Sequence, residues 1–111
     1  MGEFVRVARV DEVPPGQGKL VEAGGRYIAL FNVDGQYYAI DDECTHAAAS
    51  LSEGFVEGTV VECPLHGGQF DLRTGEAVWS PAVIPVATYA VRVEGDEIWV
   101  DPEPRPPGHG G

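Results

Sequence analysis

Two short segments of the sequence each combine a cysteine with a histidine. Cys44 and His46 lie in the first segment, Cys63 and His66 lie in the second, and sixteen residues separate His46 from Cys63. Thiolate sulfur and imidazole nitrogen are ligands suited to iron or zinc. Each segment therefore offers one thiolate and one imidazole to a shared metal centre.

The division of ligands between the two segments distinguishes the possible centres. A zinc finger usually presents two cysteines from one loop and two histidines from a helix, whereas here each segment supplies one of each and no helix is evident. A Rieske-type [2Fe–2S] cluster needs two cysteines on one iron and two histidines on the other. Two loops that each carry a cysteine and then a histidine meet that need. A zinc site, or a structural or sensory metal-binding module, remains the alternative.

The neighbours of the four ligands carry a family resemblance. The first segment reads CTHAAASLSEG from Cys44, and the second reads ECPLHGGQFD from Glu62. Both resemble the Rieske ferredoxins of bacterial aromatic-ring dioxygenase systems, and the resemblance extends over residues 3–101.

The resemblance implies a set of roles. Cys44 and Cys63 would bind the inner iron of one [2Fe–2S] cluster, and His46 and His66 would bind the outer iron through ring nitrogens. The segment Ser80-Pro81-Ala82 is similar to the proline loop that covers the cluster in this family.

Four neighbouring positions differ from the high-potential Rieske proteins of respiratory complexes. Those proteins join their two loops by a disulfide, and Ala49 and Leu65 stand where its cysteines would be. They also carry a serine and a tyrosine hydroxyl that bond the cluster and its cysteine, where this chain has Gly68 and Phe70. Because hydrogen bonds to the sulfurs raise the reduction potential, we expect a low-potential carrier.

The apolar residues come in short runs between glycine, proline and acidic turns, a pattern typical of an all-β domain. Asp34-Gly35 is suited to a tight hairpin because these residues adopt positive φ angles. We expect an antiparallel β-sandwich or small barrels that carry two cluster-binding loops. The expected strands lie near residues 3–9, 18–24, 26–33, 36–41, 54–56, 59–63, 69–72, 76–78, 86–93 and 97–101.

The length of 111 residues suits one domain. We expect the Rieske domain to span residues 1–101. Residues 102–111 read PEPRPPGHGG, which cannot bury apolar surface and predicts a flexible tail. His109 lies in that tail and is not expected to be a ligand.

The net charge of −11 comes from 18 acidic and 7 basic residues. Such a surface repels phosphate backbones and anionic membranes, so we expect neither nucleic acid nor a membrane as partner. The sequence has no apolar run long enough to span a membrane and no signal peptide, so a cytoplasmic location is expected. Acidic residues near the two loops are expected to steer a basic partner, with plain solubility as the alternative. They are Asp41, Asp42, Glu43, Glu53, Glu57 and Glu62.

The resemblance implies a one-electron carrier. It would take electrons from an NAD(P)H-dependent flavoprotein ferredoxin reductase and pass them to the terminal oxygenase of an aromatic-ring dioxygenase. A monomer is expected. The chain has no room for a mononuclear iron site or a substrate pocket, so it is expected to be an electron-transfer component and not an enzyme. The alternative within the same fold is the small Rieske subunit of an assimilatory nitrite reductase.

Overall fold

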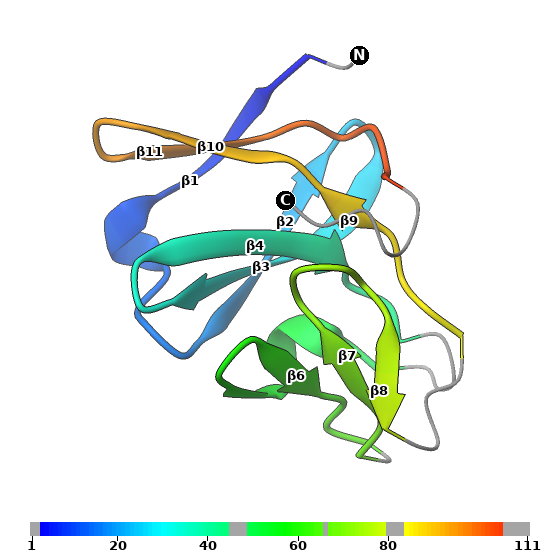
Figure 1. Cartoon of the computed structure of the whole chain (residues 1–111). Helices are drawn as coiled ribbons and strands as arrows, with labels where there is room; N and C mark the ends of the chain where they lie inside the picture. Colours follow the sequence, from blue (N-terminus) through cyan, green and yellow to red (C-terminus); the bar gives the residue numbers. More distant parts are fainter. Residues whose placement is uncertain (1–2, 45–48, 66, 80–83, 106–111) are drawn as a thin grey trace.

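The computed structural model describes residues 3–44, 49–65, 67–79 and 84–105 (Figure 1). Within them the chain is almost entirely β-structure, in agreement with the predicted fold class. The strands are β1 (Val5–Arg9), β2 (Gly18–Ala23), β3 (Arg26–Val33), β4 (Gln36–Asp41), β5 (Phe55–Glu57), β6 (Val60–Glu62), β7 (Gln69–Asp71), β8 (Ala77–Trp79), β9 (Thr88–Tyr89), β10 (Val91–Glu94) and β11 (Glu97–Val100). Two single-turn 3-10 helices, η1 (Val10–Glu12) and η2 (Leu51–Glu53), complete the described elements. No helix in these ranges is long and apolar enough to cross a membrane.

The strands form three antiparallel sheets that lie in layers (Figure 1). The first has the order β1-β11-β10, the second β2-β3-β4-β9, and the third β5-β6-β7-β8. The third sheet and η2, hereafter the small lobe, lie in sequence between the neighbouring strands β4 and β9. The other two sheets, hereafter the base, contain both ends of the described chain.

The second sheet is covered on both faces, which its sequence reflects. Ile28 and Leu30 of β3 face a core shared with the first sheet. Ala29 and Phe31, which alternate with them, face a second core shared with the small lobe. All four are fully buried. A strand buried on both faces has an apolar residue at every position instead of every second one.

The hairpin between β3 and β4 confirms the expected tight turn. Val33 pairs with Gln36, so Asp34 and Gly35 alone form the loop. Their φ angles are 52° and 87°, and positive values at both central positions match the right-handed twist of the strands.

A glycine also joins the small lobe to the base. Gly75 has φ +80°, and a Cβ there would lie 2.1 Å from the carbonyl oxygen of Val86. The amide of Val86 donates to the Gly75 carbonyl at 2.8 Å. Only glycine allows the segment before β9 to pass this close to the β7–β8 turn.

One predicted strand is wrong. The run 86–93 is not one strand but two, because β9 pairs with β4 in the second sheet and β10 pairs with β11 in the first. Ala90 lies between them, where the chain moves from one sheet to the other. Apolar residues continue through this point, so the sequence pattern does not mark the change of sheet.

The predicted tail begins against the base. The Arg105 amide donates to the Thr88 carbonyl at 2.8 Å, and the Thr88 amide donates back at 3.3 Å. Arg105 therefore lies beside β9. The boundary at residue 101 stays a prediction, and residues 106–111, with His109, lie outside the described residues.

Candidate metal centre

The structure buries both predicted cysteine ligands. Cys44 follows β4, Cys63 follows β6, and their side chains are 3% and 1% exposed. Both belong to the core between the second sheet and the small lobe. His46, His66 and the Ser80-Pro81-Ala82 segment lie outside the described residues.

The two cysteine loops are closed in the same way. The amide of Cys44 donates to the carbonyl of Ala49 at 3.0 Å, and the amide of Cys63 donates to the carbonyl of Gly68 at 2.7 Å. In both cases the bond joins a residue to the fifth one after it. Each loop is therefore closed at its base, with its cysteine buried at the start. The sequence hides this likeness, because the histidine follows at a different spacing in each segment.

Asp42 holds together the two chain segments on either side of the first loop. Its carboxylate accepts bonds from the Ser50 hydroxyl at 2.8 and 2.7 Å and from the Ser52 amide at 2.9 Å. Its carbonyl accepts from the Leu51 amide at 2.6 Å. With 7% of Asp42 exposed, this residue joins the two chain segments that enter and leave the Cys44 loop. Asp42 therefore has a structural role, and its part in steering a partner stays a prediction.

Replacing Asp42 with alanine is expected to destabilise the first loop. The Ser50 hydroxyl and the Ser52 amide would lose their acceptor inside the protein, at a cost of about 1–3 kcal/mol. Urea unfolding followed by circular dichroism and by visible absorbance would show an earlier midpoint. Glu53→Ala, an exposed acidic residue in the same segment, is the matched control. Equal midpoints for the two variants would contradict the role of Asp42.

Asp41 joins the first loop to the segment that precedes β9. Its carboxylate accepts bonds from the Tyr89 hydroxyl at 2.5 Å and from the Ala87 amide at 3.0 Å, and its amide donates to the Ala87 carbonyl at 3.1 Å. Burial, and then the bond to Asp41, raise the pKa of Tyr89. The phenol therefore stays a hydrogen-bond donor at ordinary pH. No motif marks this contact, because 48 residues separate its partners.

The residues predicted to set the potential lie at the site. Phe70 of β7 is fully buried in the same core as both cysteines, and its ring supplies no hydroxyl. Gly68 is buried beside Cys63 and has no side chain that donates. Ala49 packs against this core, while Leu65 is 56% exposed.

The donor chemistry of the described residues fits an iron–sulfur cluster. Two buried thiols begin two closed loops in one apolar core, which suits an inner iron held by two thiolates. Within the described ranges no group of three or more His, Cys, Asp or Glu gathers as a metal site, and two of the four predicted ligands lie outside those ranges. A family model described as the Rieske [2Fe-2S] domain matches residues 3–90. The chain belongs to this family, and its cofactor is one Rieske-type [2Fe–2S] cluster.

Similar proteins narrow the class further. The chain is 46% identical over 99 residues to the biphenyl dioxygenase ferredoxin subunit of Pseudomonas sp. strain KKS102, covering 88% of this chain and 91% of that protein. It is 48% identical to the 3-phenylpropionate/cinnamic acid dioxygenase ferredoxin subunit of Escherichia coli K12, covering 87% and 92%. These relatives are electron-transfer components by name.

Solved structures agree with this. The ferredoxin of carbazole 1,9a-dioxygenase from Nocardioides aromaticivorans IC177 superposes with a TM-score of 0.86 at 39% identity, covering 90% of this chain and 98% of that one. A chain from a complex of reduced oxygenase and oxidised ferredoxin in carbazole 1,9a-dioxygenase superposes with a TM-score of 0.85 at 38% identity. The match covers 92% of this chain and 95% of that one. A proposed NADH-dependent nitrite reductase small subunit from Mycobacterium tuberculosis superposes with a TM-score of 0.82, but its sequence is only 25% identical. The match covers 90% of this chain and 95% of that one. The nitrite reductase alternative is therefore the weaker one.

Proposed function

We propose that this protein is the ferredoxin component of an aromatic-ring dioxygenase system and carries single electrons to the terminal oxygenase. The observation that carries the proposal is its similarity, over more than nine-tenths of their length, to ferredoxin subunits of such systems. The relative found in a complex with its oxygenase supports the same partner here. The protein acts as a carrier and not as a catalyst, as those relatives do.

We propose Cys44 and Cys63 as ligands of the inner iron and His46 and His66 as ligands of the outer iron. The two buried thiols in one core support the cysteine pair. The bound cluster supplies a reversible one-electron couple. The surrounding chain closes both loops through the amides of the cysteines and excludes water from the thiol side through the side chains of that core.

The mixed ligand set is tested by electron paramagnetic resonance of the reduced protein. Two imidazole ligands on one iron are expected to lower the average g value below that of all-thiolate ferredoxins and to give coupling to nitrogen. His66→Ala and His46→Ala serve as comparisons, while Leu65→Ala keeps both ligands. A signal typical of four thiolates, without nitrogen coupling, would rule out this ligand set.

We infer that the electron donor is a flavoprotein reductase that oxidises NAD(P)H. A low-potential acceptor suits such a donor better than it suits quinol. The NAD(P)H pool also supports a cytoplasmic location. The net charge of −11 supports a monomer, because copies of the chain repel one another.

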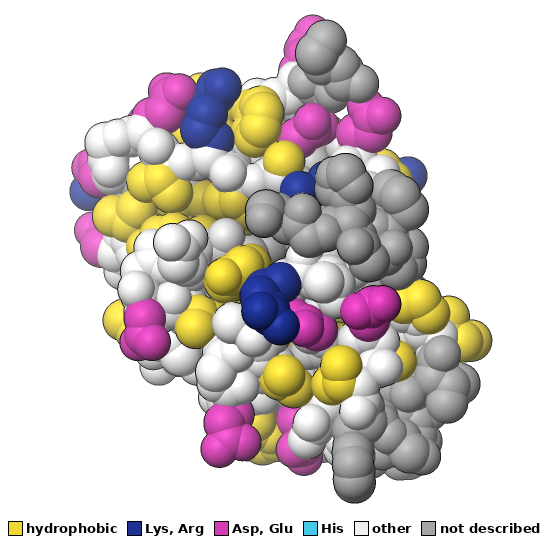
Figure 2. All heavy atoms as spheres, in the orientation of Figure 1, with side chains coloured by type: hydrophobic (Ala, Val, Ile, Leu, Met, Phe, Trp, Pro, Cys, Tyr) yellow, Lys and Arg dark blue, Asp and Glu magenta, His cyan; other side chains and the backbone are white. Residues whose placement is uncertain are grey.

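The acidic residues predicted to steer a partner differ in their exposure. Asp42 is buried and Asp41 bonds Tyr89 and Ala87, so both also have structural roles. The exposed residues of the predicted set are Glu43, Glu53 and Glu57. Figure 2 shows acidic side chains spread over both the base and the small lobe on one face of the protein.

Reduction by the reductase is expected to slow as salt is added. At physiological ionic strength, salt largely screens the attraction between these carboxylates and a basic partner at separations beyond about 8 Å. Electrostatic steering therefore falls steeply as salt is added. Stopped-flow measurement at rising NaCl gives the rate constants. Glu53→Gln is expected to flatten the salt dependence, whereas Glu3→Gln, an exposed residue next to β1, is expected to leave it unchanged. A rate constant that is independent of salt would exclude steering.

A further inference from the structure

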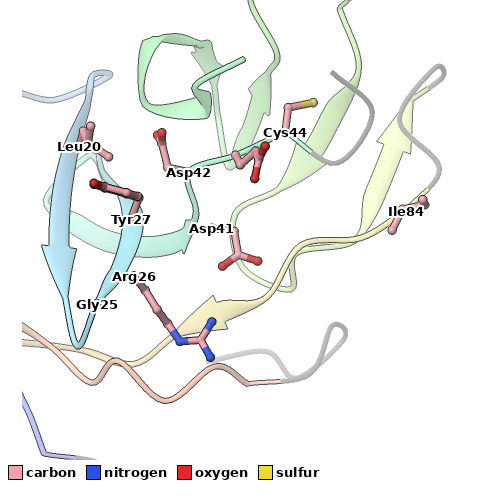
Figure 3. Close-up of a pocket in the computed structure, with 9 residues that line it drawn as sticks. Leu20, Gly25, Arg26, Tyr27, Asp41, Asp42, Cys44 and Ile84 are labelled. Atoms are coloured by element: carbon pink, nitrogen blue, oxygen red, sulfur yellow. The ribbon is translucent and has the colours of Figure 1, made fainter. Parts of the chain in front are cut away.

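A groove of about 1020 Å³ runs along the side of the protein next to Cys44 (Figure 3). Leu20 and Tyr27, on the β2–β3 hairpin, form one side, and Ile84 forms the other. These three side chains are 48%, 65% and 57% exposed. Cys44 lies on the wall between them, so the groove reaches the first cysteine loop.

The apolar side of the groove continues a buried sheet face. Tyr27 lies on the same face of β3 as Ala29 and Phe31, since side chains alternate along a strand. Leu20 pairs with Ala29 across the β2–β3 ladder and shares that face. The small lobe covers Ala29 and Phe31 completely but leaves Leu20 and Tyr27 exposed. Grouped apolar residues beside a site mark interaction surfaces, whereas scattered ones need no explanation.

The charges of the groove indicate what it accepts. Asp41, Asp42 and Glu43 line it, together with Arg26. The hydrogen bonds to the carboxylates of Asp41 and Asp42 come from amides and hydroxyls, which bring no positive charge into the groove. The groove is therefore apolar on its sides and negative overall. A second copy of this chain is an unfavourable occupant, because it carries the same −11.

We propose that this groove receives an apolar side chain of the terminal oxygenase that is flanked by lysine or arginine. The proposal rests on the proposed function and extends it, because it places part of the contact in the groove beside Cys44. A contact on one side of the first loop restricts how the carrier can rotate relative to the oxygenase. It gives the partner a second anchor on the side chains of Leu20 and Tyr27, which are not proposed metal ligands.

The double variant Leu20→Ser/Tyr27→Ser tests the apolar part. Its dissociation constant for the cognate terminal oxygenase, measured by calorimetry with both proteins loaded and oxidised, is expected to rise roughly tenfold or more. The matched control is Val5→Ser/Val93→Ser, which changes two exposed apolar residues of β1 and β10 in the first sheet. The control is expected to bind like the unmodified protein. The visible spectrum and the reduction potential of both variants are expected to stay unchanged.

The variant Leu20→Lys tests the charge part. A cation placed in the groove would face the partner's cations, so binding is expected to weaken more than in Leu20→Ser, and added salt is expected to reduce that difference. Tighter binding by Leu20→Lys would overturn the basic character of the occupant. A defect seen only with the reductase would overturn the choice of partner.

Electron delivery separates failure of this proposal from failure of the proposed function. If the unmodified protein supports oxygenase turnover and the groove variants bind as tightly as it does, the groove is not a docking site and the carrier function stands. If the unmodified protein delivers no electrons to the oxygenase, both proposals are overturned.

Discussion

Replacing Cys63 with serine is expected to give a colourless protein that holds no cluster and unfolds more readily. The Cys63 side chain is 1% exposed and lies in the core between the second sheet and the small lobe. Loss of a proposed thiolate ligand removes the bond that joins two loops distant in sequence, and the free energy of cluster binding is also folding free energy. The serine would in addition bury a hydroxyl among apolar side chains.

The measurements are iron content, visible absorbance and the thermal midpoint. Cys44→Ser is expected to behave like Cys63→Ser, since the two loops are closed alike. Leu65→Ala is the matched control, because Leu65 lies in the same loop and is largely exposed. A Cys63→Ser protein with a full iron load and an unaltered spectrum would show that this residue is not a ligand.

The reduction potential is expected near the bottom of the Rieske range, at about −150 mV. Phe70 lies in the core with both cysteines and brings no hydroxyl, and Gly68 brings no side chain. The charge of −11 also opposes the addition of an electron, although salt screens most of this effect. Protein-film voltammetry at pH 7 gives the value directly, and a midpoint above about +100 mV would place the protein in the high-potential class.

The double variant Gly68→Ser/Phe70→Tyr is the sharper measurement, because it restores both hydroxyl donors. Its potential is expected to rise, and each single variant is expected to give part of the rise. Phe55→Tyr makes the same chemical change at an exposed position of the small lobe and is expected to have no effect. If the double variant keeps its cluster and its potential does not rise, hydrogen bonding does not set the potential of this protein.

Much of the fold could be predicted because it depends on local patterns. The Asp34-Gly35 hairpin follows from the φ angles of two residues, and the short strands follow from apolar runs between turns. The change of sheet at Ala90 could not be predicted, because β9 and β10 differ only in which distant strand each one pairs with. Pairing between distant strands leaves no periodic mark in one sequence.

The proposed ligands of the site could be predicted from the sequence, but the residues that support them could not. The four proposed ligands stand out because thiol and imidazole groups recur at short spacing, and the match of residues 3–90 to the Rieske domain agrees with that pattern. The roles of Asp41 and Asp42 were not predictable. A carboxylate in an acidic stretch looks like surface charge until the fold brings Tyr89, Ala87 and Ser50 to it.

The small lobe has a further consequence for how such a protein can evolve. It leaves the base after β4 and returns at β9, and these strands are paired neighbours, with Ile40 opposite Thr88. An insertion whose two ends lie side by side can be lengthened, shortened or exchanged without moving the strands that carry it. Loop sequences that tune redox chemistry or partner choice can therefore diverge while the register of β2, β3 and β4 is kept. The base can therefore be conserved as a scaffold while the sequence of the small lobe changes.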